Sequence, residues 1–108
     1  MAPRKSLLHG TLETLVLRAL AGGPRHGYAI ARWLEDTAGD AIKVEEGSLY
    51  PALYRMEKDG LLEAEWGLSE LERRAKFYHL TAKGRGRLEA SSDDLLAFTR
   101  AIERVLGS

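Results

Sequence analysis

The amino-acid sequence predicts an α+β fold that is mainly helical and carries one small β-hairpin. Three observations support this. The first half holds three segments of helical periodicity separated by glycine-marked turns, two later segments alternate apolar and polar residues, and a Thr-capped segment of helical character runs to Leu106. We expect a first domain over residues 1–80 and a C-terminal helix over residues 81–108.

The first two predicted helices span residues 7–21 and 26–38. The first is apolar on a broad face, with Leu17 outside that face, so we expect burial by more than its own domain. Gly22-Gly23-Pro24 ends it. The second helix stops at Gly39 and turns three residues inward: Ile30, Trp33 and Leu34.

The third predicted helix spans residues 48–59 and has two unlike faces. Ser48 is expected to cap its first turn, where Pro51 is tolerated, and Gly60 is expected to close it. One face is apolar, with helical spacing at Leu49, Leu53 and Met56. The other face is aromatic and cationic, and it carries Tyr50, Tyr54, Arg55 and Lys58. Such a helix is suited to contact phosphates and base edges, although either tyrosine could instead cover the edge of the core.

Residues 62–66 and 76–80 are expected to pair as a hairpin, and residues 67–75 form its polar connection, which we call the wing. The chain has no net charge, but residues 73–87 carry six Lys or Arg side chains and no acid. The cations closest to the wing are Arg73, Arg74 and Lys76. They are predicted to bind DNA phosphates; the alternative is an ordinary solvated loop.

The last predicted helix begins after Thr81 and carries a heptad pattern. The pattern consists of Leu88, Leu95, Phe98, Ile102 and Val105. It indicates a seam between two copies of the chain; the alternative is an amphipathic helix that packs on its own domain, since two heptads are few.

Three helices followed by a hairpin with a basic wing is the order of a winged helix-turn-helix domain. Five collinear motifs also resemble the PadR family of bacterial transcriptional regulators. They are Leu7-Leu8-His9-Gly10-Thr11-Leu12-Glu13, Gly23-Pro24-Arg25-His26-Gly27-Tyr28, Glu46-Gly47-Ser48-Leu49-Tyr50-Pro51-Ala52-Leu53, Arg73-Arg74-Ala75-Lys76-Phe77-Tyr78 and Leu80-Thr81-Ala82-Lys83-Gly84. The single C-terminal helix is similar to the short subfamily, and Leu71 departs from the polar residue more usual in the wing.

The resemblance implies a homodimeric repressor whose first and last helices pack across the two-fold axis. Residues 48–59 of each copy would then enter successive major grooves of a pseudo-palindromic operator, with the wings on the backbone or minor groove. The predicted DNA-binding residues are Lys43, Ser48, Tyr50, Pro51, Tyr54, Arg55, Lys58, Arg73, Arg74 and Lys76. The predicted dimerisation residues are Leu8, Leu12, Leu88, Leu95, Phe98, Ile102 and Val105.

Other classes of function find little support in the sequence. The three histidines are far apart, there is no cysteine, and no catalytic or phosphate-loop motif is present, so we predict no enzyme, metal or cofactor. Trp33 and Trp66 are expected to pack in the core, while Leu8, Leu12, Leu95 and Phe98 are the candidates to contact a small hydrophobic effector. Without a membrane-spanning run or secretory signal, a cytoplasmic location is expected.

Two further readings stay open. A winged-helix domain can bind an acidic protein partner with the same helix and wing, and the zero net charge is compatible with that reading. Ligand binding without DNA is the other, but it would leave the wing cations unexplained. Only DNA recognition predicts that a substitution of Tyr50 changes sequence preference.

Overall fold

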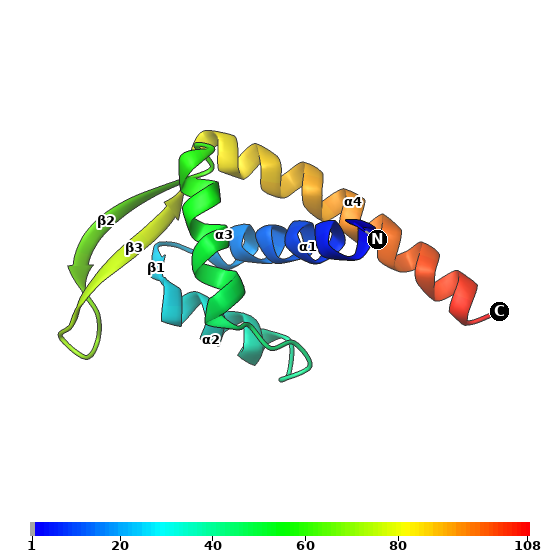
Figure 1. The fold of residues 1–108 in the computed structure, drawn as a ribbon, viewed down its shortest axis with the longest axis horizontal. Helices are drawn as coiled ribbons and strands as arrows, with labels where there is room; N and C mark the ends of the chain where they lie inside the picture. The colour runs from blue at the N-terminus through cyan, green and yellow to red at the C-terminus, as the bar shows by residue number, and fades with distance from the viewer. Residues whose placement is uncertain (1) are drawn as a thin grey trace.

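The computed structural model describes residues 2–108, with side chains from residue 10 onward. Its described residues form four helices and a three-stranded antiparallel sheet of order β1-β3-β2, which confirms the predicted α+β winged-helix fold. The elements in chain order are α1 (Ala2–Leu20), β1 (Arg25–His26), α2 (Gly27–Thr37), α3 (Glu46–Lys58), β2 (Leu62–Leu68), β3 (Arg74–Leu80) and α4 (Ala82–Leu106). Figure 1 shows the hairpin at one end and the C-terminal end of α4 projecting at the other.

The hydrophobic core lies where α1, α2 and α3 meet the base of the hairpin. Its fully buried side chains include Val16, Leu17, Ile30, Leu49, Leu53, Met56, Leu61 and Leu62. Leu17, which lies outside the broad apolar face of α1, is also buried within its own domain, at 1% exposed. Helix α1 contacts α2, α3, α4 and β3, so it is central to the domain and is enclosed on several sides by its own chain.

Helix α2 starts at a short strand that the sequence pattern does not reveal. Arg25 and His26 pair with Tyr78 and Phe77 of β3, and two residues are too few to show alternation. His26 then acts as the N-cap, because its Nδ1 accepts a hydrogen bond of 3.2 Å from the backbone N–H of Ala29. His26 therefore both pairs with β3 and fixes the start of α2.

Helix α3 begins two residues earlier than predicted, at Glu46. Its N-cap is Glu45, without a side-chain cap, so the prediction that Ser48 caps the helix was wrong. Pro51 therefore lies inside the helix, beyond the first turn, and its missing N–H leaves one internal hydrogen bond unmade. The predicted end is confirmed, because Gly60 has φ 78° and Leu61 N–H donates to Met56 O, which closes the helix.

The hairpin is longer than the alternating segments suggested. Strands β2 and β3 pair from Leu62 opposite Leu80 to Leu68 opposite Arg74, so both ends of the wing belong to strands. The connecting loop is only residues 69–73. It is closed by hydrogen bonds from Ser69 N–H to Arg73 O (2.9 Å) and from Glu72 N–H to Ser69 O (2.8 Å). The hairpin is therefore a stiff two-stranded arm, and the wing is its tightly closed end.

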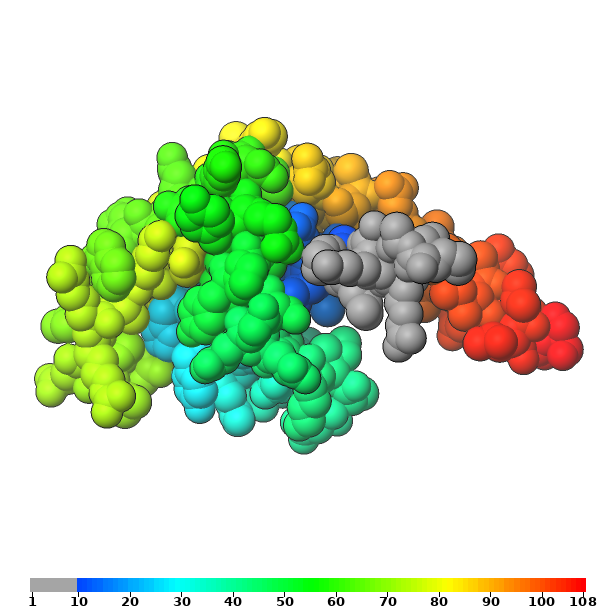
Figure 2. All heavy atoms as spheres, in the orientation of Figure 1, coloured from blue at the N-terminus to red at the C-terminus, as the bar shows by residue number. Residues whose placement is uncertain are grey.

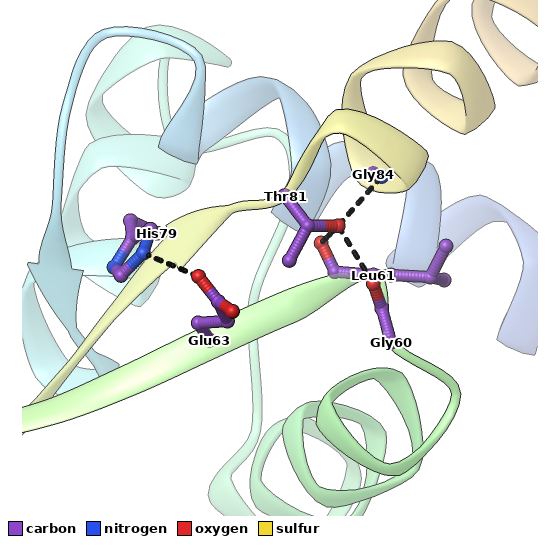
Figure 3. Close-up of polar contacts among 6 residues, drawn as sticks. All are labelled: Gly60, Leu61, Glu63, His79, Thr81 and Gly84. Atoms are coloured by element: carbon purple, nitrogen blue, oxygen red, sulfur yellow. Dashed lines mark hydrogen bonds and ion pairs between the residues drawn. The ribbon is translucent and has the colours of Figure 1, made fainter.

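The junction between β3 and α4 is held by one threonine (Figure 3). Thr81 Oγ1 accepts a hydrogen bond of 3.0 Å from Gly84 N–H, as predicted for a cap. The same hydroxyl is the donor toward two carbonyl oxygens, Gly60 O at 2.6 Å and Leu61 O at 3.1 Å. Gly84 is buried against Leu61. The start of α4 is thus attached directly to the turn that leads from α3 into β2.

Helix α4 reaches Leu106, as the sequence predicts. Its first half packs against the domain, where Leu88 joins the edge of the hydrophobic core and α4 contacts α1. Its second half extends away from the domain, as Figure 1 shows, and gives the molecule extents of 51 × 28 × 28 Å. No helix in the described part of the chain is both long and apolar enough to cross a membrane.

Candidate nucleic-acid interface

The outer face of α3 is open to solvent along its whole length. Tyr50 and Tyr54 are 45% and 66% exposed, and Ser48, Pro51 and Lys58 are also exposed. The opposite face supplies Leu49, Ala52, Leu53 and Met56 to the core. Figure 2 shows α3 in green across the front of the molecule, with the wing on one side. The two-faced character predicted from the sequence is confirmed.

Tyr50 is positioned by the start of α2. A Cβ atom on Gly27 would lie 2.6 Å from Tyr50 Cε1 and 2.8 Å from its hydroxyl oxygen, so the ring lies directly on the glycine backbone. Gly27 itself is buried. The alternative that Tyr50 covers the edge of the core is therefore partly right, but almost half of the residue still faces solvent.

Two of the predicted DNA-binding cations have acidic partners that lie far away in the sequence. Arg55 Nη2 is 3.5 Å from Glu13 Oε2 on α1, and Lys76 Nζ is 2.9 Å from Glu57 Oε1 on α3. The hydrogen bond with Glu57 raises the pKa of Lys76 above its ordinary value of 10.5. Both cations are half-buried, so these pairs hold α3 to α1 and to β3.

The wing places Arg73 and Arg74 in solvent, and neither forms an ion pair within the described residues. The Arg74 guanidinium carbon lies 4.7 Å from the centre of the Trp66 ring system. Trp66 is 60% exposed, so the prediction that it packs in the core was wrong. Trp66 is the fifth residue of the seven-residue strand β2, close to the end of the hairpin that Figure 1 shows extending away from the helices.

A polar contact connects the tip of the wing to the start of α2. His26 Nε2 lies 3.5 Å from Glu70 Oε2. Because His26 Nδ1 accepts the helix-capping bond, Nε2 must carry the proton and act as the donor. Glu70's own backbone N–H and then His26 hold the pKa of Glu70 below its ordinary value of 4.5.

Tyr28 is an exposed aromatic that the predicted site did not include. It is 62% exposed on the first turn of α2, and its ring lies 6.5 Å from that of His26. Tyr28 and Tyr50 line one groove of about 630 Å³ together with wing residues. The proximity of Tyr28 to Tyr50 depends on how α2 and α3 pack, so the spacing of residues along the chain could not predict that Tyr28 belongs to the site.

Lys43 is exposed in the loop between α2 and α3. It lines a shallow groove with Ser48, which places it beside the N-terminal end of α3. The loop is fastened by Glu35, whose Oε2 accepts a hydrogen bond of 3.0 Å from Val44 N–H. The structure thus brings Lys43, Ser48 and the exposed face of α3 to neighbouring positions, as the predicted site requires.

The predicted dimerisation residues divide into two groups. Leu12 and Leu88 are partly buried against the core of their own domain, whereas Leu95 is half-buried and lines a shallow pocket between α1 and α4 with Phe98. The three seam residues closest to the C-terminal end of α4 are exposed: Phe98 46%, Ile102 41% and Val105 73%. The side chain of Leu8 lies outside the described residues.

Comparison with known proteins gives consistent matches. The family described as Transcriptional regulator PadR-like family matches residues 16–90. A PadR-like transcriptional regulator from Bacillus cereus is 30% identical with a TM-score of 0.77, covering 95% of this chain and 98% of that chain. A PadR-like transcription factor from Bacteroides fragilis is 32% identical with a TM-score of 0.73, covering 94% and 99%. Bacillus subtilis PadR in complex with operator DNA is similar in fold, with a TM-score of 0.66 at 22% identity, covering 74% and 45%.

Proposed function

Because this chain belongs to the PadR-like family of transcriptional regulators, we propose that it represses transcription by binding a pseudo-palindromic DNA operator as a homodimer. The exposed face of α3 carries the proposal, since it presents Tyr50, Tyr54 and Ser48 beside a wing with two arginines that have no acidic partner among the described residues. Bacillus subtilis PadR, of similar fold, has been crystallised with operator DNA, which supports the same use here.

In the proposed complex α3 enters the major groove and the wing lies on the flanking backbone or minor groove. Tyr50 and Ser48 at the leading part of α3 contact base edges, and Arg73, Arg74 and Lys43 contact phosphates. Arg55 and Lys76 contribute less, because their charges are already balanced by Glu13 and Glu57.

The test is fluorescence anisotropy of the purified protein with DNA from upstream of its own gene, with random competitor and a salt titration. We expect a competitor-resistant complex whose affinity falls steeply with salt. Arg73→Ala should reduce the log–log salt slope by about one unit and leave sequence preference unchanged. Tyr50→Phe removes only the hydroxyl and keeps the ring on Gly27. It should therefore alter sequence preference, because a polar contact to a base edge is lost, and leave the salt slope unchanged, because no charge is removed.

Arg100→Ala is the matched control, because it removes one exposed positive charge from the part of α4 that projects away from the wing (Figure 1). It should behave as the wild type. Absence of binding to any DNA at low salt would contradict the proposal and favour the winged-helix module that binds an acidic protein.

The proposed dimer uses the projecting half of α4. Phe98, Ile102 and Val105 follow heptad spacing, and all three are exposed in the single chain. Ile102→Glu should shift the protein to monomer in light-scattering measurements across concentration. Leu96→Glu is the control, since Leu96 is 51% exposed but lies off the seam. Equal dimerisation of both variants would contradict this seam.

A small hydrophobic effector would bind beside the same seam. The support is the shallow pocket of about 290 Å³ in which Leu95 and Phe98 of α4 face Thr11 and Thr14 of α1. Phe98→Ala should then abolish the response of DNA binding to any effector found by screening, in the anisotropy assay described above. A response that survives this substitution would place the effector elsewhere.

A further inference from the structure

The groove between the wing and the helix-turn-helix has two chemically different walls. The hairpin side is formed by Trp66 of β2 and by Leu71, Arg73 and Arg74 of the wing. The helix side is formed by Tyr28 and Tyr50, from the starts of α2 and α3. The groove thus lies between the two parts of the molecule that are proposed to contact DNA.

Trp66 and Arg74 form one unit within this groove. Trp66 on β2 is directly opposite Lys76, and Arg74 is two residues along β3, so both side chains are on the same face of the hairpin. The Arg74 guanidinium lies over the indole at 4.7 Å, a cation–π contact. Stacking of this kind restricts the arginine to few conformations while its N–H edges stay free to bind an anion.

The domain itself does not cover the Trp66 indole. At 60% exposed, the indole leaves a large apolar surface in water next to a cation without an acidic partner among the described residues. A DNA strand offers the matching pair of surfaces, because each deoxyribose presents an apolar C–H surface and each adjoining phosphate is negative. Glu70, at the tip of the wing, also lines the groove, but its carboxylate contacts His26 of β1.

We propose that Trp66 and Arg74 act together to bind one sugar–phosphate strand of the operator, with the indole on a deoxyribose and the guanidinium on the adjoining phosphate. Trp66 is also a positioning residue, since its ring holds Arg74 in the conformation that binds. The inference rests on the proposed DNA-binding function and adds a contact residue to it.

The experiment uses the full-length protein and operator DNA. In a Trp33→Phe background, Trp66 is the only tryptophan, and its fluorescence should change on titration with operator. Trp66→Ala should weaken binding about two- to fivefold without removing a charge, while Arg74→Ala should weaken it and reduce the salt slope by about one unit. The double variant should bind more tightly than the two separate losses predict, because the residues act as a unit.

Leu96→Ala is the matched control. Leu96 is 51% exposed on α4, away from the hairpin, and it does not line the groove. It should bind operator as the wild type does, and Trp66→Phe should recover part of the lost affinity. Thermal unfolding of all variants should stay close to wild type, because the replaced side chains are largely in solvent.

The outcomes separate the two levels of the proposal. If the wild type binds operator but Trp66 fluorescence is unchanged and Trp66→Ala binds like Leu96→Ala, the inference is wrong and the DNA-binding function stands. Independent effects of Trp66→Ala and Arg74→Ala would overturn the positioning role. If the wild type binds no DNA at low salt, the inference and the proposed function both fail.

Discussion

Replacement of Gly84 by alanine should destabilise the protein although it lies in a helix. A Cβ atom at this position would lie 2.1 Å from Leu61 O, whereas an unstrained C···O contact is about 3.3 Å. The start of α4 must therefore move by about 1.2 Å from the start of β2. This movement stretches the bonds by which Thr81 N–H and Oγ1 reach Leu61 O, at 3.2 Å and 3.1 Å.

The expected cost combines three effects. Overpacking costs about 1–3 kcal/mol, and two weakened hydrogen bonds cost about 0.5–1.5 kcal/mol each. The helix propensity of alanine returns about 1 kcal/mol. We therefore expect Gly84→Ala to lower the free energy of unfolding by about 1–5 kcal/mol.

Gly86→Ala is the matched control on the same helix. Gly86 is exposed, and a Cβ there meets no atom within 4 Å, so only the propensity gain of about 1 kcal/mol applies. Urea unfolding followed by circular dichroism, at one fixed protein concentration, should separate the two variants by about 2–6 kcal/mol. Equal stability of Gly84→Ala and Gly86→Ala would refute the close approach of α4 to Leu61.

Three further outcomes are expected from the contacts described above. Thr81→Val should lower the free energy of unfolding by about 1–2 kcal/mol in the same assay, because it removes the N-cap acceptor of α4; an unchanged value would contradict that role. Gly27→Ala should displace the Tyr50 ring and weaken operator binding in the anisotropy assay more than it changes the thermal midpoint. Glu57→Gln should return the pKa of Lys76 toward 10.5 in an NMR titration. Since the folded pKa is raised, the stabilising effect of this pair should be full below pH 10.5 and disappear as pH rises through the folded value, and a wild-type advantage that persists at higher pH would contradict the sign.

Much of the fold could be predicted because it depends on local spacing and residue type. Leu49, Leu53 and Met56 repeat with the period of a helix, and they form the buried face of α3. Thr81 was identified as a cap from its residue type and the helical segment that follows it. Ser48 failed as a cap by the same reasoning, since the backbone there was already helical from Glu46.

Local patterns carried less information about the candidate site. The two-residue strand β1 was too short to show a period, and Trp66 alternated like a core residue although the hairpin extends beyond the core. Leu17 was placed off the apolar face of α1, but that helix is covered by several elements. In each case the environment depends on how far neighbouring elements extend.

The sequence by itself determined the order of the four helices and the two hairpin strands, the two faces of α3 and the extent of α4, because helical and strand periods arise from neighbours only a few residues apart. Only the tertiary structure decided which cations are free. Arg55 meets Glu13 across 42 residues and Lys76 meets Glu57 across 19, whereas Arg73 and Arg74 have no acidic partner among the described residues. Charge pairs form through space within about 4 Å, so their partners depend on packing that no local period encodes.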